Sequence, residues 1–241
     1  MSGSPPPPPR REWAYFFDLD GTLVDFADTP AAVHVSEELR LMLEQLYRDT
    51  GGAVALVSGR SLADLDRLFP HVRLPASGQH GAERRNAAGE ATRHQPAQDL
   101  APIRERLAHA IVDKPGLLLE DKGLSLALHY RRAPQLAEFV HRTVDALLPE
   151  LGDDYGIQRG KSVVELKPAG RDKGRALLEF MSEPPFAGRT PVFVGDDTSD
   201  EIGFETVNRL GGLSIKVGTG DSVAGWRLDN VMAVEQWLRS I

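Results

Sequence analysis

The sequence predicts an α/β fold in which a parallel sheet is interrupted by a second, smaller α+β domain. Apolar runs at Trp13 to Phe17, Ala53 to Val57 and Thr190 to Val194 alternate with helical patterns. This alternation is typical of a parallel sheet, whose ligands bind beyond the carboxyl ends of the strands. From about Asn86 the pattern changes to that of an open-faced sheet with a hairpin. We therefore expect the 241 residues to form one core with one insertion.

The first predicted strand, Trp13 to Phe17, leads directly into two carboxylates. Asp18 ends the strand and Asp20 follows two positions later. Gly21 and Thr22 then allow a tight turn and offer amide and hydroxyl donors. Two acids held close resist simultaneous ionisation, so one can become a proton donor, or both can share a divalent cation. A plain turn with Asp as a helix cap would explain the same residues, so the downstream chain must distinguish the two interpretations.

The next elements repeat this pattern of a buried strand followed by small polar residues. A helix is predicted from about Ser36 to Thr50, and the strand Ala53 to Val57 follows it. That strand leads into Ser58 and Gly59 before a second helical stretch from about Leu62 to Phe69. We expect Ser58 beside Asp18, where its hydroxyl can hydrogen-bond a phosphate oxygen or cap the next helix; the two roles are compatible.

A turn of small residues, Leu74 to Arg85, precedes the inserted region and contains His80. A lone histidine is more often structural than catalytic, so His80 is not the expected general base. It remains a candidate for substrate binding.

The inserted region combines two predicted helices, about Pro102 to Asp113 and Gln135 to Leu148, with a half-buried strand and a hairpin. Charged residues gather near its strand ends, where solvated surface charge is the ordinary interpretation. A mixed acidic and basic set on one sheet face would also suit a ligand with many hydroxyls and an anionic end. These charged residues are Glu120, Lys122, Arg131, Arg159, Lys161 and Glu165.

The chain then returns to the pattern of the core. Lys173 begins a predicted helix that runs to about Met181, and an ammonium group at a helix N-terminus requires an anion nearby. The strand Thr190 to Val194 leads into four acids within the six residues from Asp196 to Glu201. Such a cluster needs a cation or donors, and Mg²⁺ is the economical choice. A strand from Leu213 and a terminal helix, about 233–239, complete the predicted core.

Composition and charge exclude several classes of function. A net charge of −7 argues against a surface built to neutralise nucleic acid, and the absence of cysteine excludes disulfides and thiolate chemistry. The sequence has no apolar run long enough to span a bilayer and no apolar core of a signal peptide, so we expect a soluble, cytoplasmic protein without membrane partners. Residues 1–12, rich in proline, are expected to form an extended or disordered tail. The sequence does not indicate an oligomeric state.

The order of these features resembles the four motifs of the haloacid dehalogenase (HAD) superfamily, whose phosphatases have a Rossmann-like core. FDLDGT resembles the first motif, and a serine, a lysine and the acidic GDDTSD follow in the family's order. The resemblance implies Mg²⁺-dependent phosphoryl transfer to a nucleophilic aspartate. Carried over by position, it implies Asp18 as nucleophile and metal ligand, Asp20 as general acid and base with its backbone carbonyl on the metal, Ser58, Gly59 and Lys173 as phosphate-binding residues, Asp196 as direct metal ligand, and Asp197 or Asp200 as acids of the outer coordination shell.

A closer resemblance, to bacterial trehalose-6-phosphate phosphatases, covers nearly everything from Trp13 onward. It rests on GAERR, HYR, GK.VVELKP, KG, GDD..DE and NRLGG.S.KVG; Ser199 stands where the family usually has Thr, which preserves the hydroxyl. The resemblance implies hydrolysis of trehalose 6-phosphate, a catalytic core of residues 13–85 and 169–241, and an inserted C2-type cap of residues 86–168. The substrate-binding residues that it implies, together with the candidates above, are Glu120, Lys122, Glu165, Arg131 and His80.

Three alternatives remain open at this point. A phosphatase for another sugar phosphate, such as a mannosyl or sucrose phosphate, would use the same core motifs and differ only in the cap. A receiver-type signalling domain would use Asp18 as a stable phosphoacceptor, but it needs a chain about half as long and leaves Asp20 unexplained. A catalytically silent sugar-binding module would be expected to have lost Asp18 or Asp20, and both are present.

Overall fold

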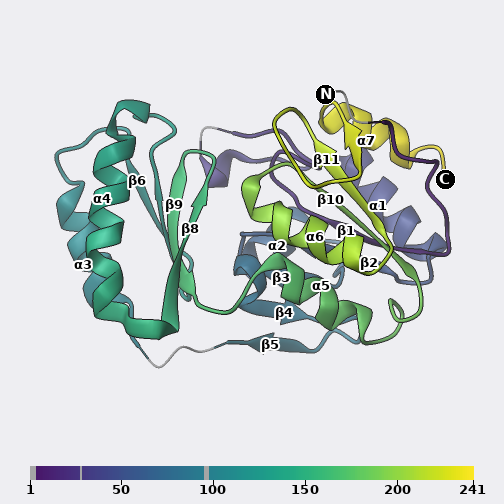
Figure 1. The fold of residues 1–241 in the computed structure, drawn as a ribbon, viewed down its shortest axis with the longest axis horizontal. Helices are drawn as coiled ribbons and strands as arrows, with labels where there is room; N and C mark the ends of the chain where they lie inside the picture. Colours follow the sequence, from purple (N-terminus) through teal and green to yellow (C-terminus); the bar gives the residue numbers. More distant parts are fainter. Residues whose placement is uncertain (1–3, 28, 95–97) are drawn as a thin grey trace. The chain divides into compact units, whose positions relative to one another are not determined.

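The computed structural model describes residues 4–27, 29–94 and 98–241, which form two compact units. Unit 1 comprises Met1–Thr92 and Asp172–Ile241, and unit 2 comprises Arg93–Arg171 (Figure 1). The division at 92/93 and 171/172 compares with 85/86 and 168/169 expected from the sequence. The difference on the N-terminal side arises because one short strand, β5 (Ala91–Arg93), extends the large sheet beyond residue 85.

Unit 1 is built on an eight-stranded sheet with the order β12-β11-β10-β1-β2-β3-β4-β5. The strands from β12 to β3 are parallel to their neighbours, and β4 is antiparallel to β3. β1 lies between β10 and β2, and all five of its residues are buried. The strands are β1 (Trp13–Phe17), β2 (Val54–Val57), β3 (Ala76–Gly78), β4 (Glu83–Arg85), β5 (Ala91–Arg93), β10 (Thr190–Gly195), β11 (Leu213–Val217) and β12 (Trp226–Leu228).

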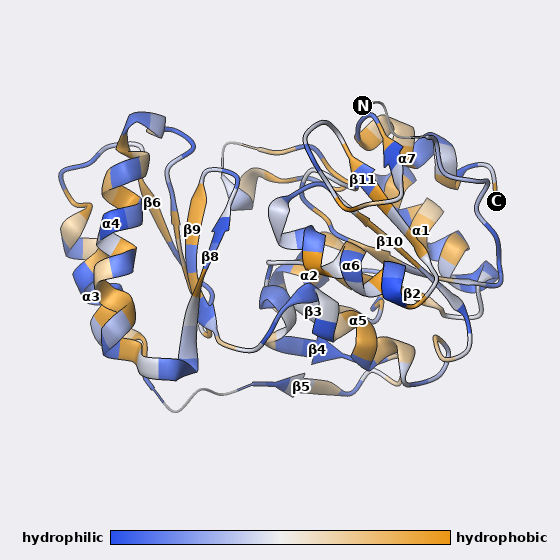
Figure 2. Ribbon diagram, viewed as in Figure 1, coloured by the Kyte–Doolittle hydropathy of each residue, from blue (hydrophilic) through white to orange (hydrophobic). Residues whose placement is uncertain are grey.

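Helices cover both faces of this sheet, because successive side chains of a strand point to opposite faces. Tyr15 and Phe17 of β1 pack in one apolar cluster with α1, α2 and α7, whereas Phe16 packs in the other with α5 and α6. Figure 2 shows the apolar strands between these helices. The helices are α1 (Glu37–Asp49), α2 (Leu62–Leu68), α5 (Lys173–Met181), α6 (Glu201–Arg209) and α7 (Val231–Leu238), with short 3-10 turns η1 (Pro30–Ala32), η2 (Gln79–Gly81) and η5 (Thr198–Asp200).

Side-chain caps fix where the core helices begin. The hydroxyl of Ser36 accepts from the Leu39 amide at the start of α1, as the sequence predicts. Asp172 in the same way accepts from the Arg175 amide before α5, so that Lys173 is the first helical residue. α6 was not predicted, because the acids at its start suggest a metal site rather than a helix.

Unit 2 is a four-stranded antiparallel sheet with two helices, in the order β6-β7-β9-β8. Leu126 and Leu128 of β7 and Val164 of β9 pack with α3 and α4 in one apolar cluster. The helices therefore cover one face of this sheet (Figure 1). The elements are α3 (Ala101–Ala110), β6 (Leu118–Asp121), β7 (Leu126–His129), η3 (Pro134–Leu136), α4 (Ala137–Leu147), η4 (Leu148–Asp154), β8 (Tyr155–Gly160) and β9 (Val163–Pro168).

The proline-rich segment before β1 has no helix or strand at residues 4–10, but it contacts unit 1. The indole nitrogen of Trp237 donates to the Pro7 carbonyl at 2.8 Å, and the Tyr15 hydroxyl bonds both backbone groups of Arg10. Polar groups of the Trp and Tyr side chains thus find hydrogen-bond partners in this segment. Residues 1–3 lie outside the described residues.

No helix within the described ranges is long and apolar enough to cross a bilayer.

Candidate active site

Three candidate residues meet at one edge of the unit 1 sheet, because the strands that deliver them are neighbours. Asp18 follows β1, Ser58 follows β2, and Asp196 follows β10. The carboxyl ends of parallel strands point the same way, so the residues after them share an edge. The buried amide of Asp18 donates to the Val194 carbonyl at 3.0 Å, which fixes the end of β1 against β10.

Lys173 connects two acids of this edge inside the protein. Its ammonium nitrogen lies 3.0 Å from Asp18 Oδ1 and 2.6 Å from Asp200 Oδ1, and its side chain is 2 % exposed. The second oxygen of Asp200 accepts from the amides of Asp196 and Asp197 at 3.0 and 2.9 Å. The carboxylates of Asp18 and Asp200 are therefore the anions that the ammonium group of Lys173 needs at the start of its helix. Asp200 in turn shapes the loop that holds Asp196.

Electrostatics at this edge are dominated by burial. Burial raises the pKa of Asp18 well above its usual range, Lys173 acts to lower it, and the carboxylates of Asp200 and Asp196 raise it further. The pKa of Asp196 rises to about 7, first through burial and then through the neighbouring acids. Burial acts to lower the pKa of Lys173, but Asp18 and Asp200 together raise it above its usual value. Burial and the neighbouring acids thus outweigh the ammonium group of Lys173 at both Asp18 and Asp196.

The acids fit a divalent cation of the oxygen-binding class. Carboxylate oxygens of Asp18, Asp196 and Asp200 lie within 4.8 Å of one another. Asp196 Oδ1 is buried and accepts no hydrogen bond from the described residues, so it has capacity for a ligand bond. Gly21, at φ +83°, leaves room for this carboxylate, since a Cβ there would lie 2.4 Å from Asp196 Oδ2. Hard cations such as Mg²⁺ prefer such oxygens.

Asp20 lies outside this cluster of carboxylates and is paired with Arg60. Arg60 Nε donates to Asp20 Oδ2 and Arg60 Nη2 donates to Asp20 Oδ1, each at 2.7 Å. The Asp20 side chain thus does not point to the acids as a metal ligand. The sequence interpretation had assigned its backbone carbonyl, not its carboxylate, to the metal.

The Ser58–Gly59 turn is packed under His80. A Cβ on Gly59 would lie 2.6 Å from His80 Nε2, so only glycine accommodates the imidazole there. The His80 amide donates to the Ser58 carbonyl at 3.1 Å, and His80 has φ +54°. Non-glycine residues rarely adopt this conformation, and strain of this kind is concentrated at functional sites. His80 therefore lies beside the candidate phosphate-binding turn.

Unit 2 brings three of the candidate cap residues to one sheet face. Glu120 is opposite Ala127, and Ala127 is opposite Glu165, so the two glutamates share a row across the sheet. Lys122 Nζ lies 3.0 Å from Glu165 Oε2, and His129 Nε2 lies 2.8 Å from Glu120 Oε2. This face is opposite to the one that packs on α3 and α4.

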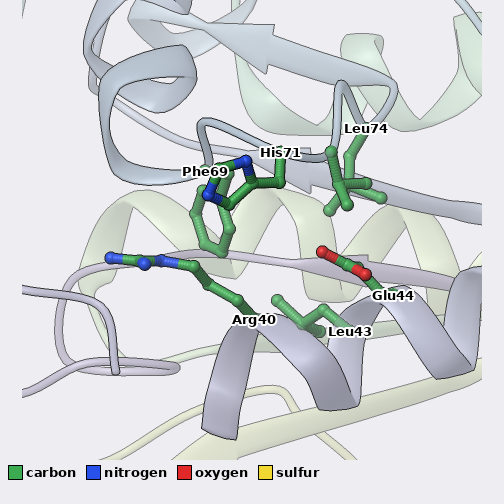
Figure 3. Close-up of a pocket in the computed structure, with 7 residues that line it drawn as sticks. Arg40, Leu43, Glu44, Phe69, His71 and Leu74 are labelled. Carbon is green, nitrogen blue, oxygen red and sulfur yellow. The ribbon is translucent and has the colours of Figure 1, made fainter. Parts of the chain in front are cut away.

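Arg131 follows β7 and donates to the Lys161 carbonyl at 3.3 Å. A small surface pocket of unit 1, between α1 and the segment after α2, contains none of the candidate residues (Figure 3). Arg40 at this pocket donates to the Leu68 and Val35 carbonyls, which is a structural role. The pocket is lined by Arg40, Leu43, Glu44, Phe69, His71, Val72 and Leu74.

Sequence reasoning missed three residues that contact the candidate residues. Arg60 pairs with Asp20, Lys216 of β11 donates from its ammonium group to the Asp196 carbonyl, and His129 pairs with Glu120. A cation directly after Ser58 and Gly59 was a signal that could have identified Arg60. Lys216 could have been identified as the one charged residue of the predicted strand LSIKV.

Comparisons with known proteins agree with this arrangement. The family model described as trehalose-phosphatase matches residues 16–232. The trehalose-6-phosphate phosphatase of Escherichia coli (strain K12) is 46 % identical over 231 residues, which cover 95 % of this chain and 86 % of that protein. A probable trehalose-phosphate phosphatase of Sinorhizobium fredii is 45 % identical over 206 residues, covering 86 % of this chain and 78 % of that protein.

Among solved structures, the C-terminal domain of Candida albicans trehalose-6-phosphate phosphatase superimposes with a TM-score of 0.82 at 24 % identity, covering 93 % of this chain and 89 % of that one. This likeness concerns the fold, and it confirms the predicted class of an α/β core built on a mostly parallel sheet with a separate antiparallel sheet. The family model and the two relatives extend over most of the chain. On this evidence the chain belongs to the trehalose-phosphatase family.

Proposed function

We propose that the protein hydrolyses trehalose 6-phosphate to trehalose and phosphate through an aspartyl phosphate on Asp18. The observation that carries this proposal is the buried carboxylate of Asp18 at the end of the central strand, 3.0 Å from Lys173 and beside Asp196. A nucleophile held by a rigid strand, with cationic charge for the phosphoryl oxygens, is the arrangement that phosphoryl transfer requires.

The first half of the reaction forms a bond between an Asp18 oxygen and phosphorus, while the bond from phosphorus to the sugar oxygen breaks. Asp20 gives a proton to that leaving oxygen. Ser58, the Gly59 amide and Lys173 hold the phosphoryl oxygens. Asp20 then takes a proton from a water molecule whose oxygen attacks the phosphorus, which releases phosphate and restores Asp18.

Mg²⁺ is the metal that we propose, because the donors are carboxylate oxygens in a chain without cysteine. Asp18, Asp196 and the Asp20 carbonyl would hold it, and Asp197 and Asp200 would belong to the outer coordination shell. A bound Mg²⁺ ion would neutralise charge that develops on the phosphoryl oxygens. Asp200 is already bonded to Lys173 and to two amides, which suits a role beside the metal and not on it.

Residues 86–168 are proposed as the cap that recognises the sugar. Glu120, Lys122 and Glu165 share one sheet face, where carboxylates can accept hydrogen bonds from sugar hydroxyls and an ammonium can donate. Arg131 and His80 are proposed as further substrate-binding residues. The ion pair of Lys122 with Glu165 and the contact of His129 Nε2 with Glu120 Oε2 keep these polar groups oriented.

The decisive experiment measures phosphate release by the full chain from a panel of sugar phosphates, with Mg²⁺ and after chelation. We expect trehalose 6-phosphate to give the highest kcat/KM, chelation to stop turnover, and Mg²⁺ to restore it. A preference for another sugar phosphate would refute the assigned substrate while leaving the phosphatase chemistry intact. Full turnover after exhaustive removal of divalent ions would refute the metal site.

A further inference from the structure

Arg60 follows the proposed phosphate-binding turn, but its guanidinium group is directed to the proposed proton donor. Its Nε and Nη2 each donate to one oxygen of Asp20 at 2.7 Å, and Nη1 donates to the Pro30 carbonyl at 3.0 Å. Two parallel bonds between a planar guanidinium and a carboxylate fix the orientation of both groups, which a lysine cannot do. The side-chain rotation of Asp20 is therefore set by Arg60.

The same short segment also faces the phosphoryl site. The Arg60 amide donates to Ser58 Oγ at 3.2 Å, and the Arg60 carbonyl accepts from the Gln79 amide at 2.8 Å. The backbone of Arg60 is thus fixed on both sides while its side chain reaches Asp20. One rigid turn thereby couples the position of the phosphate-binding hydroxyl to that of the proton donor.

The ion pair is buried at Arg60 and only partly exposed at Asp20. The Arg60 side chain is 8 % exposed and that of Asp20 is 27 % exposed. A buried ion pair loses much of its attraction to desolvation, so it contributes little to stability by itself. Such a pair can instead act by orienting a reacting group, since a displacement of that group by about 1 Å can lower the reaction rate about 100-fold.

We propose that Arg60 is a positioning residue that orients Asp20 for its two proton transfers, an inference that rests on the phosphatase function proposed above. When Asp20 has given its proton to the leaving oxygen, both of its oxygens bind Arg60, as they do in this structure. The carboxylate then takes one proton from the attacking water. To donate that proton in the next cycle, Asp20 gives up one of the two bonds, because the protonated oxygen must face the leaving group and not Arg60.

The test compares esters that need protonation of the leaving group with one that does not. Arg60→Met and Arg60→Lys are assayed in single turnovers with phenyl phosphate and p-nitrophenyl phosphate, following release of the phenol. For Arg60→Met we expect a loss of about 100-fold or more with phenyl phosphate, the range of general acid catalysis. The loss with p-nitrophenyl phosphate, whose phenolate leaves without a proton, should be at least about ten times smaller. Arg60→Lys should lie between Arg60→Met and the parent.

A matched control removes another buried arginine from the same unit. Arg85, whose side chain is 7 % exposed, binds both oxygens of Asp66 and has no part in the proposed chemistry. Arg85→Met should therefore change the rates of both esters by the same factor. On an Asp20→Asn background, Arg60→Met should add no further loss, whereas effects of independent sites would multiply.

Equal losses of both esters in Arg60→Met, or no loss, would overturn the proposal. If Arg60→Met does not fold, the Arg60→Lys variant decides by the same comparison. The aryl esters do not contain trehalose, so failure of the substrate assignment would leave this comparison valid. Conversely, if Arg60 proves to have no positioning role, the assay of trehalose 6-phosphate hydrolysis by the parent enzyme still tests the proposed function.

Discussion

Asp18 is the single residue on which the proposed chemistry depends most. Asp18→Asn keeps the size of the side chain but removes the charged nucleophile, so we expect turnover of all phosphate esters to be abolished. The variant should remain folded, because it removes one of several buried acids that repel one another. Phosphate release and the thermal unfolding midpoint measure the two expectations. Substantial activity in folded Asp18→Asn would contradict the covalent mechanism.

Asp196 gives the metal-free protein a pH dependence whose sign follows from its raised pKa. Its pKa is about 7 in the folded protein against 3.8 ordinarily, so between these values the folded state binds more protons than the unfolded state. The free energy of unfolding should therefore fall as pH rises from about 4 to 7. The decrease should be at most about 4 kcal/mol, since one pKa unit corresponds to about 1.4 kcal/mol.

Denaturant unfolding of chelated protein at pH 5 and pH 8 measures this decrease. Added Mg²⁺ should restore stability chiefly at pH 8, because it favours the ionised acids. Asp196→Asn, which does not titrate, should show a smaller pH dependence and a smaller response to Mg²⁺. A stability that is constant or rises over this range would contradict the expectation.

The turn after β1 is the element that makes room for the metal ligand. Gly21→Ala would place a Cβ 2.4 Å from Asp196 Oδ2 at φ +83°, so the ligand must move. We expect stability to fall and the Mg²⁺ concentration required for half-maximal activity to rise. Gly89 has the same φ of +83° but nothing within 4 Å of its Cβ position, so Gly89→Ala is a matched control.

In Gly89→Ala only the backbone strain remains, at about 1–2 kcal/mol. Its Mg²⁺ requirement should equal that of the parent. Equal Mg²⁺ requirements in Gly21→Ala and Gly89→Ala would show that the turn does not control the metal ligand.

At the level of elements, the strands of unit 1 that could be predicted from the sequence are those with four or more residues, and its three-residue strands could not be predicted. β1, β2 and β10 are largely apolar runs followed by polar residues, and these three strands and β11 lie within one or two residues of the predicted bounds. By contrast, β3, β4, β5 and β12 have three residues each, too few for a periodic signal. Their pairing is determined by the neighbouring strand and not by their own composition.

The candidate site divides in the same way. Asp18, Lys173 and Asp196 could be predicted because each follows a strand or begins a helix that is visible in the sequence. The Arg60–Asp20 pair could not, since its partners are 40 residues apart and only the order of strands brings them together. Nor could the pairing of Lys122 with Glu165, 43 residues apart, because it depends on the registers of β6 and β9 against the strand between them, β7.

For the whole molecule, division into two units predicts a separation between chemistry and substrate choice. Loss of a buried bond to a sugar hydroxyl costs about 1–3 kcal/mol. Glu120→Ala, Lys122→Ala and Glu165→Ala should therefore each lower kcat/KM for trehalose 6-phosphate by about 5- to 150-fold, since each 1.4 kcal/mol is a factor of about ten. Activity on p-nitrophenyl phosphate, a small ester without sugar hydroxyls, should change less.

Arg142→Ala, which removes a side chain 74 % exposed on α4, is the surface control and should not change either substrate. If the three variants hydrolyse trehalose 6-phosphate like the parent, the assignment of sugar contacts is wrong. An equal loss of activity on trehalose 6-phosphate and on p-nitrophenyl phosphate in folded variants would also contradict the assignment of sugar contacts.

The discontinuity of unit 1 has a consequence for synthesis of the chain on the ribosome. β1 hydrogen-bonds β10, whose residues follow those of β1 by more than 170 positions. Unit 2, in contrast, is one uninterrupted stretch, Arg93–Arg171, and has its own apolar cluster. At about 5–20 residues per second, β1 waits at least about ten seconds for its neighbour. Unit 2 can therefore fold before unit 1 is complete. During that interval the N-terminal part of unit 1, which is synthesised first, lacks its partner strand and is accessible to chaperones.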